Sequence, residues 1–159
     1  MRFQNVKPEE LEGPIKLPGF QEWTGNLQHN PGITSVLLTS GPGLGKGSAI
    51  GSLAETLHYD VVRCRLSQLL EYPNPAAEFR VMLEGTKNLH RTVLWLDGVD
   101  RFLTHIPGGA DEGQGVLQLW LETEKLPLER NEVIVVATAR EASKVPHPLA
   151  EAFDQSFQA

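Results

Sequence analysis

Short apolar runs alternate with segments of helical period along most of the chain. The apolar runs are strand-sized and rich in Val, Ile and Leu, and they predict strands at residues 34–39, 60–66, 92–97 and 132–138. Between the runs, apolar residues recur every three or four positions, as Ile50, Leu53, Ala54 and Leu57 do. This period predicts helices at residues 20–27, 47–58, 75–90, 116–125 and 147–153, and the last residues predict an edge strand.

Strands that are apolar throughout and alternate with helices are typical of a parallel sheet covered on both faces. We therefore predict an α/β fold with a five-stranded parallel sheet and helices on both of its faces. Ligands of such sheets bind outside the carboxyl ends of the strands, so functional side chains are expected there. Residues 106–115 are rich in glycine and are predicted to form a loop.

The N-terminal part of the chain is dense in prolines and glycines, which interrupt helices and strands. This composition predicts an irregular arm at residues 1–30 and an α/β core at residues 31–159. The length of 159 residues suits one domain with a single folded unit. We expect no helical lid after the core.

The charge and composition exclude several classes of protein. The net charge of −6 argues against a broad nucleic-acid interface. The apolar runs are too short to cross a bilayer, and the N-terminus has no apolar signal region, so no membrane partner and a cytoplasmic setting are expected. Cys64 is the single cysteine, which excludes an intrachain disulfide.

The strongest local motif is a glycine-rich turn between a predicted strand and a predicted helix. It reads S-G-P-G-L-G-K-G-S over residues 40–48, close to the phosphate-loop pattern G-x-x-x-x-G-K-[ST]. Ser40 stands at the first glycine, and Gly47 replaces the hydroxyl residue that would bind Mg²⁺. A turn that merely needs glycine is the alternative. The predicted nucleotide-binding residues are Gly41, Gly43, Leu44, Gly45, Lys46, Gly47 and Ser48.

A phosphate-loop protein also needs an acid at the end of a second apolar strand, where it holds Mg²⁺ through water. Asp97 directly follows the run V-L-W-L and is the predicted metal residue. A helix cap or turn residue is the alternative for this aspartate. Asp100 lies three positions further on and is expected to be a surface or capping acid.

Three segments together resemble the AAA-type P-loop ATPases. Residues 93–102 resemble their second motif, residues 132–140 resemble their sensor strand, and residues 145–154 resemble the element that follows it. The order and spacing of these segments agree with the family over residues 17–157. The residue pattern is most similar to that of the short AAA proteins of cyanobacteria and plastids. The resemblance implies a P-loop domain that binds ATP or ADP, with Mg²⁺ near Asp97.

The same resemblance exposes positions where hydrolytic groups are missing. Gly98 stands where hydrolysing members carry a glutamate that activates water, and Ala139 stands at the sensor asparagine. The arginines expected around Phe153 and Asp154 are absent as well. These departures indicate a degenerate site, with hydrolysis that is slow or absent.

The function expected from these residues is nucleotide binding that serves assembly or regulation. The expected partners are the nucleotide and either other AAA subunits or a protein client. Two alternatives stay open at this point. One is an active ATPase completed by a partner subunit in a mixed ring, and the other is a structural interaction module that binds no nucleotide.

Overall fold

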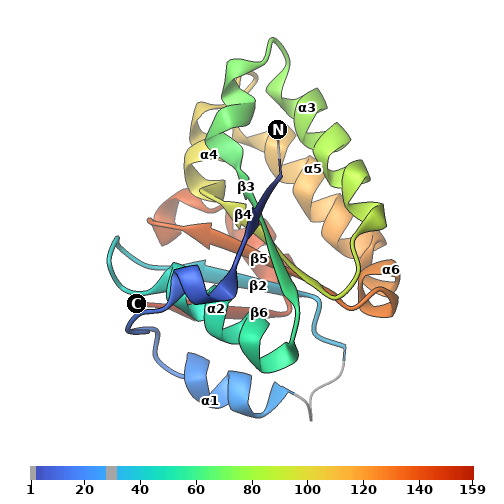
Figure 1. The fold of residues 1–159 in the computed structure, drawn as a ribbon. Helices are drawn as coiled ribbons and strands as arrows, with labels where there is room; N and C mark the ends of the chain where they lie inside the picture. The colour runs from blue at the N-terminus through green and yellow to red at the C-terminus, as the bar shows by residue number, and fades with distance from the viewer. Residues whose placement is uncertain (1–2, 28–31) are drawn as a thin grey trace.

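The computed structural model describes residues 3–27 and 32–159, and its centre is one six-stranded sheet (Figure 1). The strands are β1 (Gln4–Val6), β2 (Ser35–Thr39), β3 (Asp60–Arg65), β4 (Thr92–Asp97), β5 (Val133–Ala139) and β6 (Gln155–Gln158). Their order across the sheet is β1-β3-β4-β5-β2-β6. The strands β2 to β6 are parallel, which confirms the five predicted parallel strands, and β1 adds to β3 in the antiparallel direction.

Helices cover both faces of the sheet, as predicted (Figure 1). The α-helices are α1 (Phe20–Gly25), α2 (Lys46–Leu57), α3 (Pro75–Glu84), α4 (Val99–His105), α5 (Ala110–Thr123), α6 (Lys125–Arg130) and α7 (His147–Ala152). Short 3-10 helices are η1 (Pro8–Leu11), η3 (Leu66–Glu71), η4 (Gly85–Asn88) and η5 (Ala142–Lys144). The helix predicted at residues 75–90 is therefore divided, because the α-helix ends at Glu84 and a 3-10 turn follows it.

The two faces of the sheet carry two separate apolar clusters. Successive residues of a strand point to opposite faces, so Val93 and Trp95 of β4 pack with α1 and α2. Leu94 and Leu96 pack on the other face against α3, α4 and α5. The sheet is buried on both sides, and the carboxyl ends of its parallel strands remain as the place for a site.

The loop predicted at residues 106–115 is wrong in its second half, since α5 begins at Ala110. The glycines that suggested a loop have another role. A Cβ on Gly113 would lie 2.7 Å from Cδ2 of Leu103, a residue of α4 that is fully buried. Gly113 therefore allows α5 to pack closely on α4, and this tertiary contact outweighs the low helix propensity of glycine.

The N-terminal segment contains regular structure and lies against the core. Its strand β1 pairs with β3, and η1 packs on α2, where a Cβ on Gly51 would lie 2.9 Å from both Cβ of Leu11 and the carbonyl oxygen of Pro8. Gly51 in the middle of α2 thus permits the close approach of η1. The predicted boundary between residues 30 and 31 lies outside the described residues.

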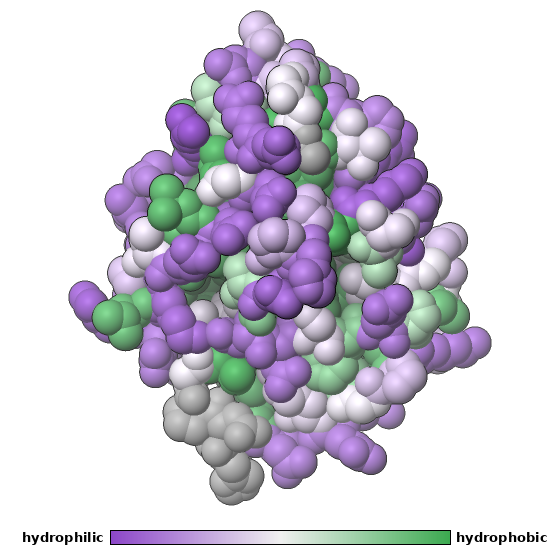
Figure 2. All heavy atoms as spheres, turned by 180° about the vertical axis from the view of Figure 1, so that it is seen from behind, coloured by the Kyte–Doolittle hydropathy of each residue, from purple (hydrophilic) through white to green (hydrophobic). Residues whose placement is uncertain are grey.

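The molecular surface is predominantly hydrophilic on the face opposite to that of Figure 1. Figure 2 shows this face, where hydrophobic residues appear only in small groups between polar ones. Large apolar side chains that are exposed include Val81, Leu119 and Leu126, and scattered exposure of this kind is ordinary for a folded domain. Within residues 3–27 and 32–159, no helix has the length and apolar character needed to span a membrane.

Candidate nucleotide site

The glycine-rich loop connects β2 to the first turn of α2. Gly43 and Gly45 adopt φ of +81° and +90°, a region that side chains rarely tolerate, and Gly45 is the N-cap of α2. Ser40 is not among the non-glycine residues with positive φ, so serine is tolerated at the first position of the motif. Its N–H donates to the carbonyl of Ala139 at 3.1 Å, which ties the loop to the end of β5.

The N-terminal segment contacts this loop. The N–H of Lys16 donates to the carbonyl of Leu44 at 3.0 Å, and a Cβ on Gly45 would lie 2.2 Å from the carbonyl oxygen of Pro14. No residue with a side chain fits at Gly45 while the segment keeps this position. The segment therefore packs directly against the loop, a contact that the motif alone does not predict.

Lys46 is held at the start of α2 by two backbone carbonyls. Its Nζ donates to the carbonyl of Ala139 at 3.2 Å and to that of Ser40. Burial lowers the pKa of Lys46, and the charge of Arg140 lowers it further, while two nearby carboxylates oppose the shift. An ammonium has three N–H donors, so one donor is left for an anion that enters the loop.

All of the predicted site residues line one cavity of about 360 Å³. The loop contributes Gly41, Gly43, Leu44, Gly45, Lys46, Gly47 and Ser48, and Asp97 reaches the same cavity from the end of β4. Glu10 and Glu12 of the N-terminal segment line it too, and both are exposed. The predicted residues therefore share one cavity, and the sequence did not indicate that two carboxylates also line it.

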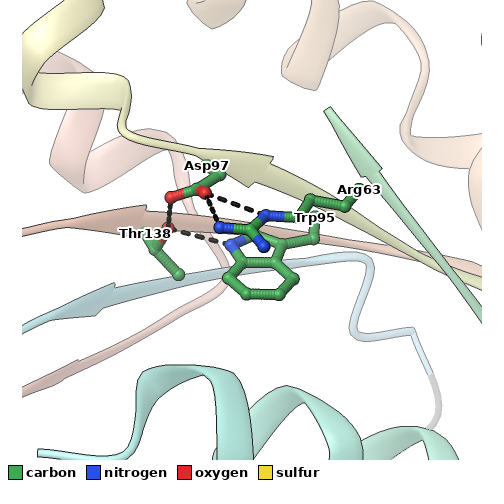
Figure 3. A network of polar contacts seen from close by, with 4 residues as sticks. All are labelled: Arg63, Trp95, Asp97 and Thr138. Carbon is green, nitrogen blue, oxygen red and sulfur yellow. Dashed lines mark hydrogen bonds and ion pairs between the residues drawn. The ribbon is translucent and has the colours of Figure 1, made fainter. Parts of the chain in front are cut away.

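Asp97 belongs to a network that joins three strands (Figure 3). Arg63 of β3 forms an ion pair with it, donating from Nε and Nη2 to Oδ2, with Nε at 2.9 Å. The hydroxyl of Thr138 donates to Oδ1 at 3.3 Å and itself accepts the indole N–H of Trp95 at 2.9 Å. The guanidinium lies over the ring of Trp95, 4.3 Å from its centroid.

These residues do not fit the Mg²⁺ site that the resemblance implies. Gly47 offers no hydroxyl oxygen, and both carboxylate oxygens of Asp97 already accept hydrogen bonds from Arg63 and Thr138. Mg²⁺ at nucleotide sites relies on one or two protein oxygens beside phosphate and water, and here the hydroxyl is missing and the carboxylate is already paired with an arginine.

Gly98 and Ala139 occupy two positions at which the resemblance implies polar side chains. Gly98 has φ of +83°, and its N–H donates to the carbonyl of Thr138 at 3.1 Å, so a glutamate here would be strained. Ala139 is buried, and its carbonyl accepts from Ser40 and Lys46. Neither position presents a polar side chain that would activate or orient a water molecule.

Asp100 is buried, so the first of the two predicted roles, that of a surface acid, is wrong. Its side chain is 5% exposed, and Oδ2 accepts the N–H groups of Arg140 and Glu141, each at 3.1 Å. The carboxylate thereby fixes the chain directly after β5. This contact joins α4 to the segment that follows β5. Because the two segments are distant in the sequence, no local motif predicts it.

A second cavity of about 590 Å³ adjoins the first and shares Lys46, Asp97 and Thr138 with it. Its cationic residues are Lys46, Arg63, Arg65, Arg101, Arg140 and Lys144. The sequence motif identified Lys46 of α2 but not the other five residues, because these come from β3, α4 and the segment after β5 and form no motif. The cavity carries more positive than negative side chains, which suits an anionic ligand.

The fold and the loop together define a P-loop nucleoside triphosphatase domain: a largely parallel sheet in which strand β2, between β5 and β6, leads through a glycine-rich turn and a lysine into a helix. The family described as "ATPase family associated with various cellular activities (AAA)" matches residues 36–159, and the chain belongs to this family. This confirms the resemblance stated from the sequence.

Among solved structures, the chain is similar to the FIGL-1 AAA domain in complex with ADP, with a TM-score of 0.69 and 13% sequence identity. The match covers 98% of this chain and 57% of the other, so this chain spans little more than half the length of that structure's chain. At this identity the likeness shows the fold alone. No curated protein matches the sequence.

Proposed function

We propose that this domain binds an adenine nucleotide, ATP or ADP, and uses it for assembly or regulation. The observation that carries the proposal is the cavity in which the loop residues and Lys46 converge at the N-terminus of α2. Backbone N–H groups of a glycine-rich turn and a helix N-terminus favour phosphate oxygens, and the lysine adds a full positive charge. The FIGL-1 AAA domain of similar fold was solved with ADP, which supports the same ligand here.

Hydrolysis in this domain is proposed to be slow or absent. Gly98 offers no base, its left-handed backbone disfavours a glutamate, and the methyl group of Ala139 cannot orient a water molecule. The loss of one such group typically costs several kcal/mol of barrier, and here several are missing together. A domain of this kind retains nucleotide and responds to which nucleotide is bound.

Calorimetric titration with ADP and ATP tests the binding. We expect heat of binding and a thermal shift in the natural protein, and the loss of both in Lys46→Ala, because this substitution removes the ammonium that faces the phosphates. A matched control is Lys87→Ala, since Lys87 is exposed and forms a local ion pair with Glu84. Absence of binding in the natural protein would refute the proposal.

Steady-state release of phosphate tests the proposal that hydrolysis is slow or absent. Turnover at the rate of ordinary ATPases, about 1 per second or faster, would contradict slow hydrolysis even if binding is found. The measurement is made with the protein alone and with added AAA subunits, because a mixed ring would supply missing arginines in trans. Turnover only in the mixture would favour the partner-completed enzyme.

A further inference from the structure

The acid at the end of β4 has a fixed cationic partner. In P-loop domains of this kind the corresponding carboxylate serves Mg²⁺, whereas here Arg63 donates to Oδ2 of Asp97 from two nitrogens. Thr138 donates to the other oxygen. Figure 3 shows the guanidinium lying between the carboxylate and the ring of Trp95, which fixes its position from the opposite side.

The register of β3 and β4 explains how the arginine reaches this place. Arg63 stands opposite Trp95, and Arg65 stands opposite Asp97. Because side chains alternate along a strand, all four lie on the same face of the sheet. Arg63 therefore extends across the indole ring to the carboxylate, and a second arginine flanks the same position.

Arg63 also retains hydrogen-bonding capacity toward an anion. A guanidinium has five N–H donors in a planar fork, and Asp97 accepts only two of them. Arg63 lines the larger cavity, which meets the loop cavity at Lys46, Asp97 and Thr138. The planar fork matches phosphate oxygens well, so the arginine is suited to the phosphate end of a nucleotide.

We propose that this domain binds its nucleotide without Mg²⁺, and that the Arg63 guanidinium provides the positive charge beside Asp97 that a divalent cation provides in related sites. This inference rests on the proposed nucleotide binding and specifies the ligand as the metal-free nucleotide. A Mg²⁺ ion would stand beside the guanidinium of Arg63, would meet a carboxylate that this arginine already neutralises, and would lack a hydroxyl ligand at Gly47. A metal complex of the nucleotide would also bring a second cation close to the guanidinium.

The test is the affinity for ADP in two buffers, one with EDTA and one with excess Mg²⁺, measured by calorimetry on the natural protein. We expect a dissociation constant that is equal in the two buffers or larger in Mg²⁺. A dissociation constant at least about tenfold smaller in Mg²⁺ would overturn the inference and leave the proposed function intact. Absence of binding in both buffers would overturn both.

Two substitutions extend the test, because they are expected to change the affinity for ADP in EDTA in opposite directions. Asp97→Asn removes the negative charge that neutralises Arg63, so we expect tighter binding of ADP in EDTA. If Asp97 instead served a metal ion, the same substitution would weaken binding in Mg²⁺ and leave binding in EDTA unchanged, which would contradict the inference.

The second substitution is Arg63→Gln, which removes the cation and frees the carboxylate. We expect weaker binding in EDTA and a new strengthening of binding by Mg²⁺, with Arg63→Lys recovering part of the affinity in EDTA. Circular dichroism and thermal unfolding establish that each variant is folded. Binding by a folded Arg63→Gln variant that equals the natural protein in EDTA would refute the role of Arg63, and Asp97→Asn decides the question if Arg63→Gln does not fold.

Discussion

The backbone N–H of Thr34 donates to Oδ2 of Asp154 at 2.7 Å, across 120 positions of sequence. The hydroxyl of Thr34 donates to the same oxygen at 3.2 Å, and the N–H of Asp154 donates to the hydroxyl of Ser35 at 2.9 Å. Lys125 completes the arrangement with an ion pair to Oδ1 at 2.6 Å. One carboxylate therefore joins the start of β2, the start of β6 and the helix α6.

Replacement of Asp154 by alanine is expected to lower the free energy of unfolding by about 2–3 kcal/mol. The substitution removes charge-assisted hydrogen bonds and leaves the N–H of Thr34 without its partner in a residue that is 3% exposed. Asp154→Asn is the matched control, because its amide oxygen still accepts from Thr34 while the ion pair with Lys125 is lost. Urea unfolding that ranks the alanine variant equal to the natural protein would contradict this account.

Two glycines of α5 are expected to respond to alanine in opposite directions. Gly113→Ala forces a Cβ against the buried side chain of Leu103 and should destabilise the fold by about 1–3 kcal/mol. Gly115→Ala has no atom within 4 Å of the new Cβ, so the better helix propensity of alanine should stabilise by about 0.5–1 kcal/mol. Thermal unfolding of both variants checks the pair, and equal shifts in midpoint would refute the close packing of α4 and α5.

The acids at the edge of the loop cavity are expected to oppose nucleotide binding. Glu10 and Glu12 line the cavity, so their carboxylates repel phosphate oxygens. The double variant Glu10→Gln with Glu12→Gln should bind ADP more tightly, by less than about tenfold at low salt, with the gain shrinking as salt increases. Glu55→Gln is the control, because Glu55 is exposed near the other end of α2. An identical gain in the control would mean that only the net charge matters.

Nucleotide binding should take up a proton at alkaline pH through Lys46. Burial, and then the charge of Arg140, lower the pKa of the free lysine below 10.5, and a bound phosphate raises it again. A pKa that rises on binding gives an affinity that is constant at lower pH and falls as the pH increases through the pKa of the free lysine. Calorimetry in buffers of different ionisation enthalpy measures the uptake. No proton uptake, or a growing affinity toward pH 10.5, would show that the phosphate does not reach this ammonium.

The sequence predicts the elements that rest on local periodicity. The strand β4 has the predicted limits, and the loop with Lys46 lies between a strand and a helix as expected, because a buried strand and an amphipathic helix have distinct periods. The sequence also located Asp97 at the carboxyl end of β4. These features depend on residues that are neighbours in the chain.

Contacts between distant segments were not predictable in the same way. The partner of Asp97 is Arg63, and nothing in one sequence shows that β3 lies beside β4 in the register that brings them together. Gly113 was predicted to lie in a loop because glycine is unfavourable in helices. The close contact with α4 that explains a glycine in this helix is tertiary, so the local sequence does not indicate it. The strand β1 lies in the segment predicted to be irregular, and it is extended because it pairs with the edge of β3.

The position of β2 between β5 and β6 has a consequence for how the protein is made. Both neighbours follow β2 late in the chain, so a ribosome releases the glycine-rich loop long before the strands that hold it in place have emerged. Pairings between such distant segments form slowly, and an unpaired apolar strand is open to wrong associations during that interval. The loop therefore acquires its shape only after residues 133–158 have emerged, when β5 and β6 close around the strand that precedes it.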